Sequence, residues 1–433
     1  MKIRKHLSAS GLFRCVRQGF KQVEDLRTGV VQISLPDALM SGFALFSLKE
    51  PSLLAFDERR KDPENLHTVY GVEQVPSDTQ MRTILDDVEP EKLRRVYRDI
   101  FRQLQRGKGL AEYRILGQYY LLSLDGTGYF ASKKVHCENC MVKKLRSGET
   151  LYYHQMLGAA LVHPHLKTVV PLMPEPIIKQ DGHKKNDCER NAAKRFFEKL
   201  RQDHPHLPLI VTEDALSSNA PHIRELKKHH LRFILGVKES DHAFLFEQVA
   251  QARESGRSHT YVVTKDGFSH RFHFVNQLPL NASNPDVQVN FLEYWEVSPK
   301  GEQYFAWITD FTITSQNAYT LMRAGRARWK IENETFNTLK NQGYHFEHNF
   351  GHGHAHLSVI FALLMMLAFL VDQIQQAACQ LFQATLAKVG SKKRLWEKMR
   401  GLFFHLPFTC MEDIWRALLY GYKISGFVIL EET

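Results

Sequence analysis

The amino-acid sequence predicts an α/β protein built on a mixed sheet with flanking helices, with an inserted antiparallel β region and helical regions at both ends. Strand and helix patterns alternate between residues 186 and 237, which is typical of parallel strand pairing. From 241 to about 310, after a first helix, strand patterns follow one another without helices between them. The chain has 433 residues, 43% of them apolar, which is enough for several domains of roughly 100 to 200 residues with buried cores.

The charge balance indicates a polyanionic partner. Lys plus Arg exceed Asp plus Glu by ten, and the isoelectric point is about 9.2. A basic balance of this kind favours association with nucleic acid and says nothing about the fold. The six cysteines are few for this length and scattered, which indicates reduced thiols and not a disulfide framework.

Neither a secretory signal nor a membrane span is predicted. The basic N-terminal segment lacks an apolar stretch before a small-residue cleavage site. The longest apolar stretch, Leu357–Val371, is interrupted by Ser358 and is shorter than the roughly 20 residues that a bilayer requires. We therefore expect a buried helix there, no membrane partner, and a cytoplasmic protein that is associated with the nucleoid if its partner is DNA.

Residues 1–110 have a mostly helical pattern. Helix start signals occur at 76–79, which reads Pro-Ser-Asp-Thr, and at 89–91, which reads Glu-Pro-Glu. Basic residues recur at 58–61 and 94–95. These features predict a helical DNA-binding region, although solvated helix faces carry such charges as well.

The strand pattern begins at Gln118. An apolar run over Tyr119–Leu124 is followed by a second run over Tyr129–Val135, with an Asp-Gly pair at Asp125 between them. Asp-Gly between two strands is a strong hairpin signal, so Asp125 either shapes a turn or stands as a functional acid at a strand end. Strands over 151–161 and 168–173 complete a predicted meander.

The next segment predicts parallel strands with a helix between them. The elements are, in order, a helix over Asn186–Gln202, a strand over Leu207–Thr212, a helix from Asn219 and a strand over Arg232–Val237. The first of these strands closes on Glu213 and Asp214. Binding sites in such sheets form beyond the carboxyl ends of the strands. If the strands that end at Asp125 and Asp214 are neighbours, the two carboxylates meet.

The rest of the chain contains the β insertion and further helices. The predicted antiparallel strands are His259–Val275, Val287–Val297 and Gln303–Asp310. Helical pattern returns at Ser315, and a basic stretch lies within 392–400. The predicted regions are 1–110 (helical, DNA-binding), 111–240 (first part of the mixed-sheet core), 241–310 (inserted β region), 311–380 (second part of the core, with a helix that carries glutamates) and 381–433 (helical and basic).

Two glutamates in the stretch 323–356 are not equivalent. At about 100° per residue, several apolar side chains fall within about 60° of Glu332 on a helical wheel, whereas Glu334 falls on the far side. These apolar neighbours are Trp329, Phe336 and Leu339. A carboxylate on an apolar stripe needs a cation. That cation is either Arg328, one turn earlier in an ordinary i,i+4 pair, or a metal ion.

Three acids have the composition of a two-metal site. Asp125, Asp214 and Glu332 each stand where a sheet edge or an inward helix face can present a carboxylate. Mg²⁺ is a hard cation that takes a few carboxylate oxygens and keeps several waters, and Mn²⁺ is an alternative. Two such ions would clamp the attacking and leaving oxygens of a phosphoryl transfer.

The same residues lie in motifs that resemble a known family. The motifs read LSLDGTG, VTEDALSSNAPHI with FILGVK after it, and RWKIENETFNTLKNQGYHFEHNFGHG. From about Gln118 to His356, the chain resembles the cut-and-paste DDE transposases of bacterial insertion sequences, of the IS-four type. This group has an RNase H-like core, a β region inserted before the catalytic glutamate, and a Tyr-x2-Arg-x3-Glu-x6-Lys signature.

The resemblance implies roles for individual residues. Asp125 and Asp214 match the two catalytic, metal-binding aspartates, and Glu332 matches the glutamate. Arg328 matches the signature arginine, and Lys340 stands one residue beyond the signature lysine; both would contact DNA. The tyrosine position of the signature holds a glycine instead.

The implied function is metal-dependent cleavage at element ends followed by strand transfer into target DNA. The partners would be double-stranded terminal inverted repeats and target DNA, bound by a homodimer as is usual in this family. Two alternatives remain: an RNase H-like nuclease that cuts without joining, and a DNA-binding protein with a decayed catalytic centre. The intact acids argue against decay.

Other metal candidates have ordinary explanations. His136, Cys137 and Cys140 form an HCxxC cluster, but the sequence has no second CxxC, so ordinary thiols are favoured over a zinc site. Asp187 and Glu189 stand at a predicted helix start, where acids favour the helix dipole. Five histidines follow the glutamate helix among glycines, and a loop near the DNA backbone is favoured for them: His345, His348, His352, His354 and His356.

Overall fold

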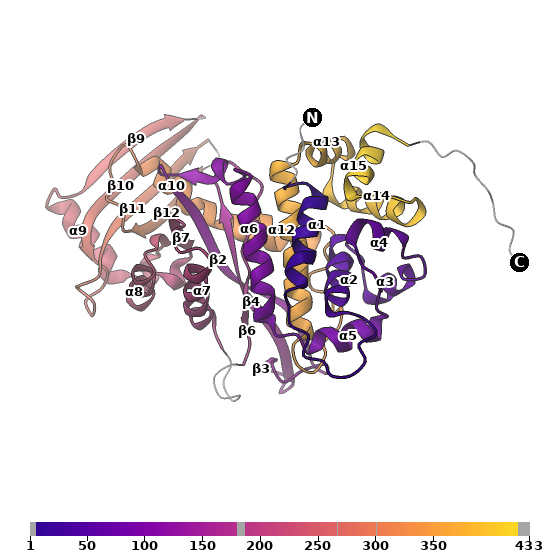
Figure 1. Ribbon diagram of the computed structural model, residues 1–433. Coiled ribbons are helices and arrows are strands. Elements are labelled where there is room, and N and C mark those ends of the chain that lie inside the picture. The colour runs from indigo at the N-terminus through magenta and orange to yellow at the C-terminus, as the bar shows by residue number, and fades with distance from the viewer. Residues whose placement is uncertain (1–5, 180–186, 266, 300, 423–433) are drawn as a thin grey trace, which may run out of the picture. The chain divides into compact units, whose positions relative to one another are not determined.

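A computed structural model of the chain describes residues 6–179, 187–265, 267–299 and 301–422. These residues form two compact units (Figure 1). The first, here called the helical unit, combines 1–109 with 338–433, and the second, the sheet unit, is the continuous segment Leu110–Asn337.

The helical unit is organised around α12 (Leu357–Ala378), which lies beside α1 and α2 (Figure 1). Among the described residues, α12 alone has the length and composition of a membrane span, but all of its most apolar window is buried inside the protein. The predicted buried helix is confirmed. At 22 residues it is longer than the apolar stretch indicated, because polar residues at its C-terminal end, such as Gln375, are also buried and helical.

The other α-helices of this unit come from both ends of the chain. They are α1 (Ala9–Phe20), α2 (Leu35–Ser47), α3 (Leu53–Arg59), α4 (Glu64–Tyr70), α5 (Asp78–Asp86), α6 (Arg94–Arg106), α13 (Gln380–Val389), α14 (Lys392–His405) and α15 (Met411–Tyr420). The predicted start of α5 is confirmed, since Ser77 and Gln80 form a capping box at its N-terminus. The basic stretch at 392–400 lies in α14.

A buried ion pair joins the two chain segments of the helical unit. The Lys49 ammonium contacts the Asp372 carboxylate, which also accepts the Tyr344 hydroxyl at 2.7 Å. The same ammonium lies 4.2 Å from the centre of the Trp396 ring. Since a buried charge without a partner is costly, this cluster requires the N-terminal and C-terminal segments to be present together.

The sheet unit contains a 12-stranded mixed sheet among the described residues. Its main path runs β3-β4-β2-β7-β8-β12-β11-β10-β9, with β1 on β2 and with β5 and β6 on β4. The strands are β1 (Arg114–Ile115), β2 (Tyr119–Ser132), β3 (Met141–Lys144), β4 (Thr150–Val162), β5 (Val170–Pro171), β6 (Glu175–Ile177), β7 (Leu209–Glu213), β8 (Arg232–Gly236), β9 (His259–Lys265), β10 (Phe268–Pro279), β11 (Gln288–Ser298) and β12 (Gly301–Thr309).

The predicted fold class is confirmed. β2, β7 and β8 are parallel neighbours and β4 runs antiparallel to β2, as expected for an RNase H-like core. The flanking helices are α7 (Glu189–Asp203), α8 (Ala220–Lys228), α9 (Ala243–Glu254) and α10 (Ala318–Arg326). Asn186, where the sequence predicts α7 to begin, lies outside the described residues.

The predicted antiparallel strands of the insertion are present, but the single strand expected over His259–Val275 is two antiparallel strands, β9 and β10, which precede β11 and β12. They do not form a separate sheet, because β12 pairs with β8 through Ile308 and Leu235 and so extends the parallel core. The structure also divides the predicted region 311–380. Residues up to Asn337 belong to the sheet unit, whereas 338–380 belong to the helical unit because α12 packs there against α2 and α5.

The predicted hairpin at Asp125 is wrong. β2 runs without a turn from Tyr119 to Ser132 and pairs with β4 from Leu121 onward, placing Asp125 opposite Gly158. A β-bulge lies between Gly128 and Phe130. Local Asp-Gly turn propensity is overridden here by the long partner strand, so Asp125 does not shape a turn.

Candidate active site

The parallel register of the core brings Asp125 and Asp214 to one edge of the sheet. Ser123 on β2 pairs with Thr212 on β7, and each aspartate lies two residues beyond its member of this pair. Asp214 follows β7 directly, and its carboxylate accepts the backbone N–H of Leu216 at 3.0 Å. The two aspartates line the same cavity of about 300 Å³. The two strands are therefore neighbours, which is the condition under which their carboxylates were expected to meet.

Glu332 lies in an irregular helical segment. The chain passes from a 3-10 turn, η5 (Ala327–Trp329), through a π-helix, η6 (Ile331–Phe336), to α11 (Asn337–Asn341). The prediction of a regular helix at 100° per residue is thus wrong, and Trp329, assigned to the apolar stripe, is 54% exposed. Short π-helical turns are frequent at functional sites.

The π-helical turn is nevertheless anchored on the strand that carries Asp125. η6 contacts both β2 and β4, and its Phe336 ring lies over Gly158, the residue that pairs with Asp125. The hydroxyl of Ser123 donates to the carbonyl of Arg328 at 3.0 Å. These contacts hold the segment that carries Glu332 against the edge of the sheet.

Arg328 connects Glu332 with Asp125. Its Nη1 lies 2.7 Å from Glu332 Oε1 and 4.0 Å from Asp125 Oδ2. The i,i+4 pair that was one explanation for Glu332 is therefore formed. The same guanidinium also places Glu332 beside an acid of the sheet edge, so the ion pair and a metal-binding role are compatible.

A fourth acid, Glu189, joins this group. It is the first residue of α7 and lines the cavity with both aspartates. Its carboxylate occupies the space that a side chain at Gly126 would need. Burial and the nearby carboxylates of Asp214 and Glu213 raise the pKa of Glu189. The helix-dipole explanation is incomplete, and apart from the helix-start position no sequence signal marks this residue.

The surroundings of Asp125 disfavour its ionised form. Burial, followed by the charge of Glu332, raises the pKa of Asp125 to about 6, although Arg328 opposes the rise. A divalent cation would relieve this repulsion, and a donor set of carboxylate oxygens suits Mg²⁺. Asp125, Asp214 and Glu332 are thus suitable residues for holding such an ion.

Neighbouring residues have other partners. Glu213 is buried and bonded through Oε2 to His222 Nε2 at 2.6 Å. Burial opposes protonation of His222, but the Glu213 carboxylate outweighs it and raises the His222 pKa.

Glu334 acts electrostatically on Lys330 and has no such effect on Asp125. Lys340 belongs to the helical unit, where its ammonium contacts Glu347 at 2.8 Å. A DNA-binding role for Lys340 stays a prediction.

In metal-free buffer we expect Asp125→Asn to raise the melting temperature at pH 7. The folded-state pKa of Asp125, about 6, lies above its ordinary value of 3.8, so the wild type loses stability as pH rises between these values. Mg²⁺ should raise the wild-type melting temperature more than that of the variant. Thermal melts at pH 5 and at pH 7, with Mg²⁺ and with EDTA, measure both differences. Equal Mg²⁺ responses in the two proteins would contradict a metal-binding role for Asp125.

Comparison with known proteins identifies the family. No curated protein matches the chain. Among solved structures, the fold is similar to the piggyBac transposase in a cryo-EM synaptic complex with hairpin DNA, with a TM-score of 0.43 and 10% sequence identity, covering 96% of this chain and 81% of that one. The profile of the transposase DDE domain matches residues 137–370, which make up more than half of the chain. The matched segment contains Asp214 and Glu332, while Asp125 precedes it. The chain therefore belongs to the transposase DDE domain family.

Proposed function

We propose that this chain is a cut-and-paste DNA transposase of the IS-four type, which cleaves element ends and transfers them into target DNA. The observation that carries the proposal is the meeting of Asp125 and Asp214 at one sheet edge, with Glu332 beside Asp125. Membership of the DDE family implies phosphoryl-transfer catalysis and supports the same conclusion.

Each side chain has a role in this proposal. Asp125, Asp214 and Glu332 would hold two Mg²⁺ ions, for which Mn²⁺ could substitute. When bound, these ions stabilise the attacking and leaving oxygens of an in-line phosphoryl transfer. Arg328, 2.7 Å from Glu332, keeps that carboxylate turned toward Asp125 and lowers the charge repulsion between them. A DNA phosphate that approaches the acids can also contact this guanidinium.

The DNA partners in this proposal are the terminal inverted repeats and the target duplex, bound by a homodimer. A net charge of +10 supports DNA binding because cationic side chains neutralise phosphates. The three carboxylates of the candidate site are a small part of this basic chain. Lysines and arginines can therefore bind the DNA backbone while these carboxylates serve the reaction.

The test is an assay with purified full chain, duplex DNA that carries the element ends, and a target plasmid. With Mg²⁺ or Mn²⁺ we expect cleavage at the ends and joined products, and with EDTA neither. Cleavage without joined products would favour a nuclease. Specific binding without cleavage under any metal condition would favour a DNA-binding protein that has lost its activity.

Affinity for DNA should fall steeply with salt. Because neutralised phosphates release counterions, we expect the dissociation constant to rise about tenfold or more between roughly 50 and 200 mM NaCl. Fluorescence anisotropy with a labelled duplex measures this dependence. Sucrose at matched osmolality is the control and should leave the affinity unchanged. A flat salt dependence would contradict the role assigned to the basic charge balance.

A further inference from the structure

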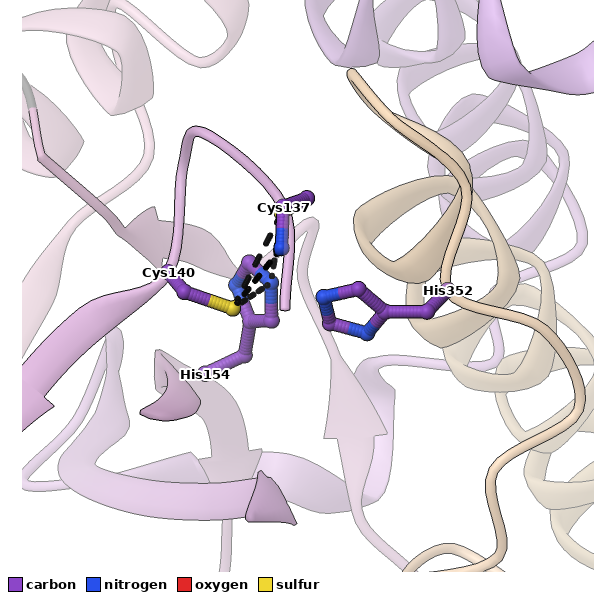
Figure 2. Close-up of side chains that lie close together, drawn as sticks. All are labelled: Cys137, Cys140, His154 and His352. Atoms are coloured by element: carbon purple, nitrogen blue, oxygen red, sulfur yellow. Dashed lines mark hydrogen bonds between the residues drawn. The ribbon is translucent and has the colours of Figure 1, made fainter. Parts of the chain in front are cut away.

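Outside the acidic site, two cysteines and a histidine of the sheet unit lie together (Figure 2). Cys137 and Cys140 belong to the segment between β2 and β3, and His154 lies on β4. Cys137 Sγ is 3.8 Å from Cys140 Sγ, and His154 Nε2 is 3.3 Å from Cys137 Sγ and 3.4 Å from Cys140 Sγ. All three residues are buried, with exposed fractions of 7%, 1% and 0%.

These distances match the edges of a zinc tetrahedron. Zn–S bonds of about 2.3 Å and Zn–N bonds of about 2.0 to 2.1 Å place two sulfurs about 3.8 Å apart and a sulfur and a nitrogen about 3.5 Å apart. The observed separations lie within a few tenths of an ångström of these values. A disulfide would instead bring the sulfurs to about 2.05 Å.

The backbone around the two cysteines also favours metal binding. The N–H of Cys140 donates to the carbonyl of Cys137 at 3.2 Å, which closes a tight turn. The N–H of Cys137 in turn donates to the Sγ of Cys140 at 3.5 Å. These two bonds hold the cysteine sulfurs close together. The His154 ring is stacked against Tyr129, with 5.8 Å between ring centres, and this packing restrains its orientation.

We propose that Cys137, Cys140 and His154 bind a structural Zn²⁺ ion. Two thiolates and an imidazole suit zinc, whereas the carboxylates of the acidic site suit Mg²⁺, so each site selects its own metal. A fourth ligand would complete the tetrahedron. His352, also drawn in Figure 2, belongs to the helical unit.

The zinc site ties the segment that follows β2 back to β4. His154 pairs with Phe130 at the bulge of β2, four residues along β4 from Gly158, which pairs with Asp125. A metal bridge at this point fixes the β2–β4 register beside the bulge. Removal of zinc should therefore lower the stability of the sheet unit without removing any of the carboxylates.

Metal analysis of the full chain, purified without chelator, tests the proposal. We expect about one zinc ion per chain in the wild type and less than about a fifth of that in the double variant Cys137→Ser/Cys140→Ser. Cys15→Ser, which removes a thiol distant in sequence from Cys137 and Cys140, should retain zinc. Asp125→Asn should retain it as well, so the result does not depend on the proposed transposase activity.

A second measurement needs no variant and so is unaffected by misfolding. The wild type is stripped of metal under reducing conditions and titrated with Co²⁺. We expect sulfur-to-cobalt charge-transfer absorption that saturates at about one equivalent and is abolished by Zn²⁺. Absence of this absorption, retention of zinc by the double variant, or a Cys137–Cys140 disulfide in the purified protein would each overturn the proposal.

Discussion

Asp125→Asn and Asp214→Asn should bind element-end DNA as the wild type does and cleave it at least about 100-fold more slowly, the scale seen when one group that stabilises a transition state is removed. Phosphate contacts come from lysines and arginines, whereas the metal ligands are carboxylates. An amide keeps the shape of the side chain but not its charge. Gel shifts and single-turnover cleavage with Mg²⁺ measure the two properties separately.

Asp286→Asn is the matched control for this pair. Asp286 also lies in the sheet unit, but it is solvent-exposed and contacts Arg224 at 2.8 Å. This variant should cleave at the wild-type rate. Near-normal cleavage by Asp125→Asn or by Asp214→Asn would show that the aspartate concerned is not a metal ligand.

The cleavage rates of Glu332→Gln and Glu334→Gln should differ by about 100-fold or more. Glu332 contacts Arg328 and acts on Asp125, so its amide variant should lose about 100-fold or more of the cleavage rate while the fold is retained. Glu334 acts on Lys330 instead, and its amide variant should change stability by no more than about 0.5 kcal/mol and leave cleavage intact. Metal-dependent cleavage at equal folded concentration is the decisive comparison.

The two glutamates control for each other, since they have the same chemistry and lie in the same π-helical turn. An inactive Glu334→Gln beside an active Glu332→Gln would reverse the assignment of the third ligand. Loss of activity in both would indicate that the geometry of the turn itself is required.

The parallel core could be predicted because its signals are local. Alternating strand and helix patterns predicted parallel strands, and the carboxylates of Asp125 and Asp214 were expected to meet if their strands were neighbours. Pairing between β2 and β7 shows that they are. Local signals gave a wrong prediction at Asp125, where the Asp-Gly pair indicated a turn. Whether β2 turns or continues at Asp125 is decided by pairing with β4, more than 25 residues later in the chain. Tertiary pairing of this kind overrides turn propensity.

Two site residues were not predicted from the sequence, and the reason is a different one. Glu189 reaches the acids because Gly126 leaves room for its carboxylate, and His154 reaches Cys137 because β4 folds back along β2. Neither residue belongs to a motif with fixed spacing. The π-helical turn at Glu332 is likewise set by packing on β2 and β4 and not by periodicity. The helical wheel therefore placed Trp329 and Glu332 on a buried stripe, whereas Trp329 is 54% exposed and the Glu332 side chain 46% exposed.

The division of the helical unit into two segments has a consequence for synthesis of the chain. The ribosome makes α2 early, yet Phe46 packs on Phe361 of α12, whose residues emerge only after the whole sheet unit. Domains generally fold as they are synthesised, and apolar surface that is left exposed promotes aggregation. The nascent chain must therefore keep α2 without its partner while the sheet unit, a continuous segment, completes its fold. A chain that ends at Asn337 would retain all four acids and still lack the helix that covers Phe46, so it would depend on chaperones for solubility.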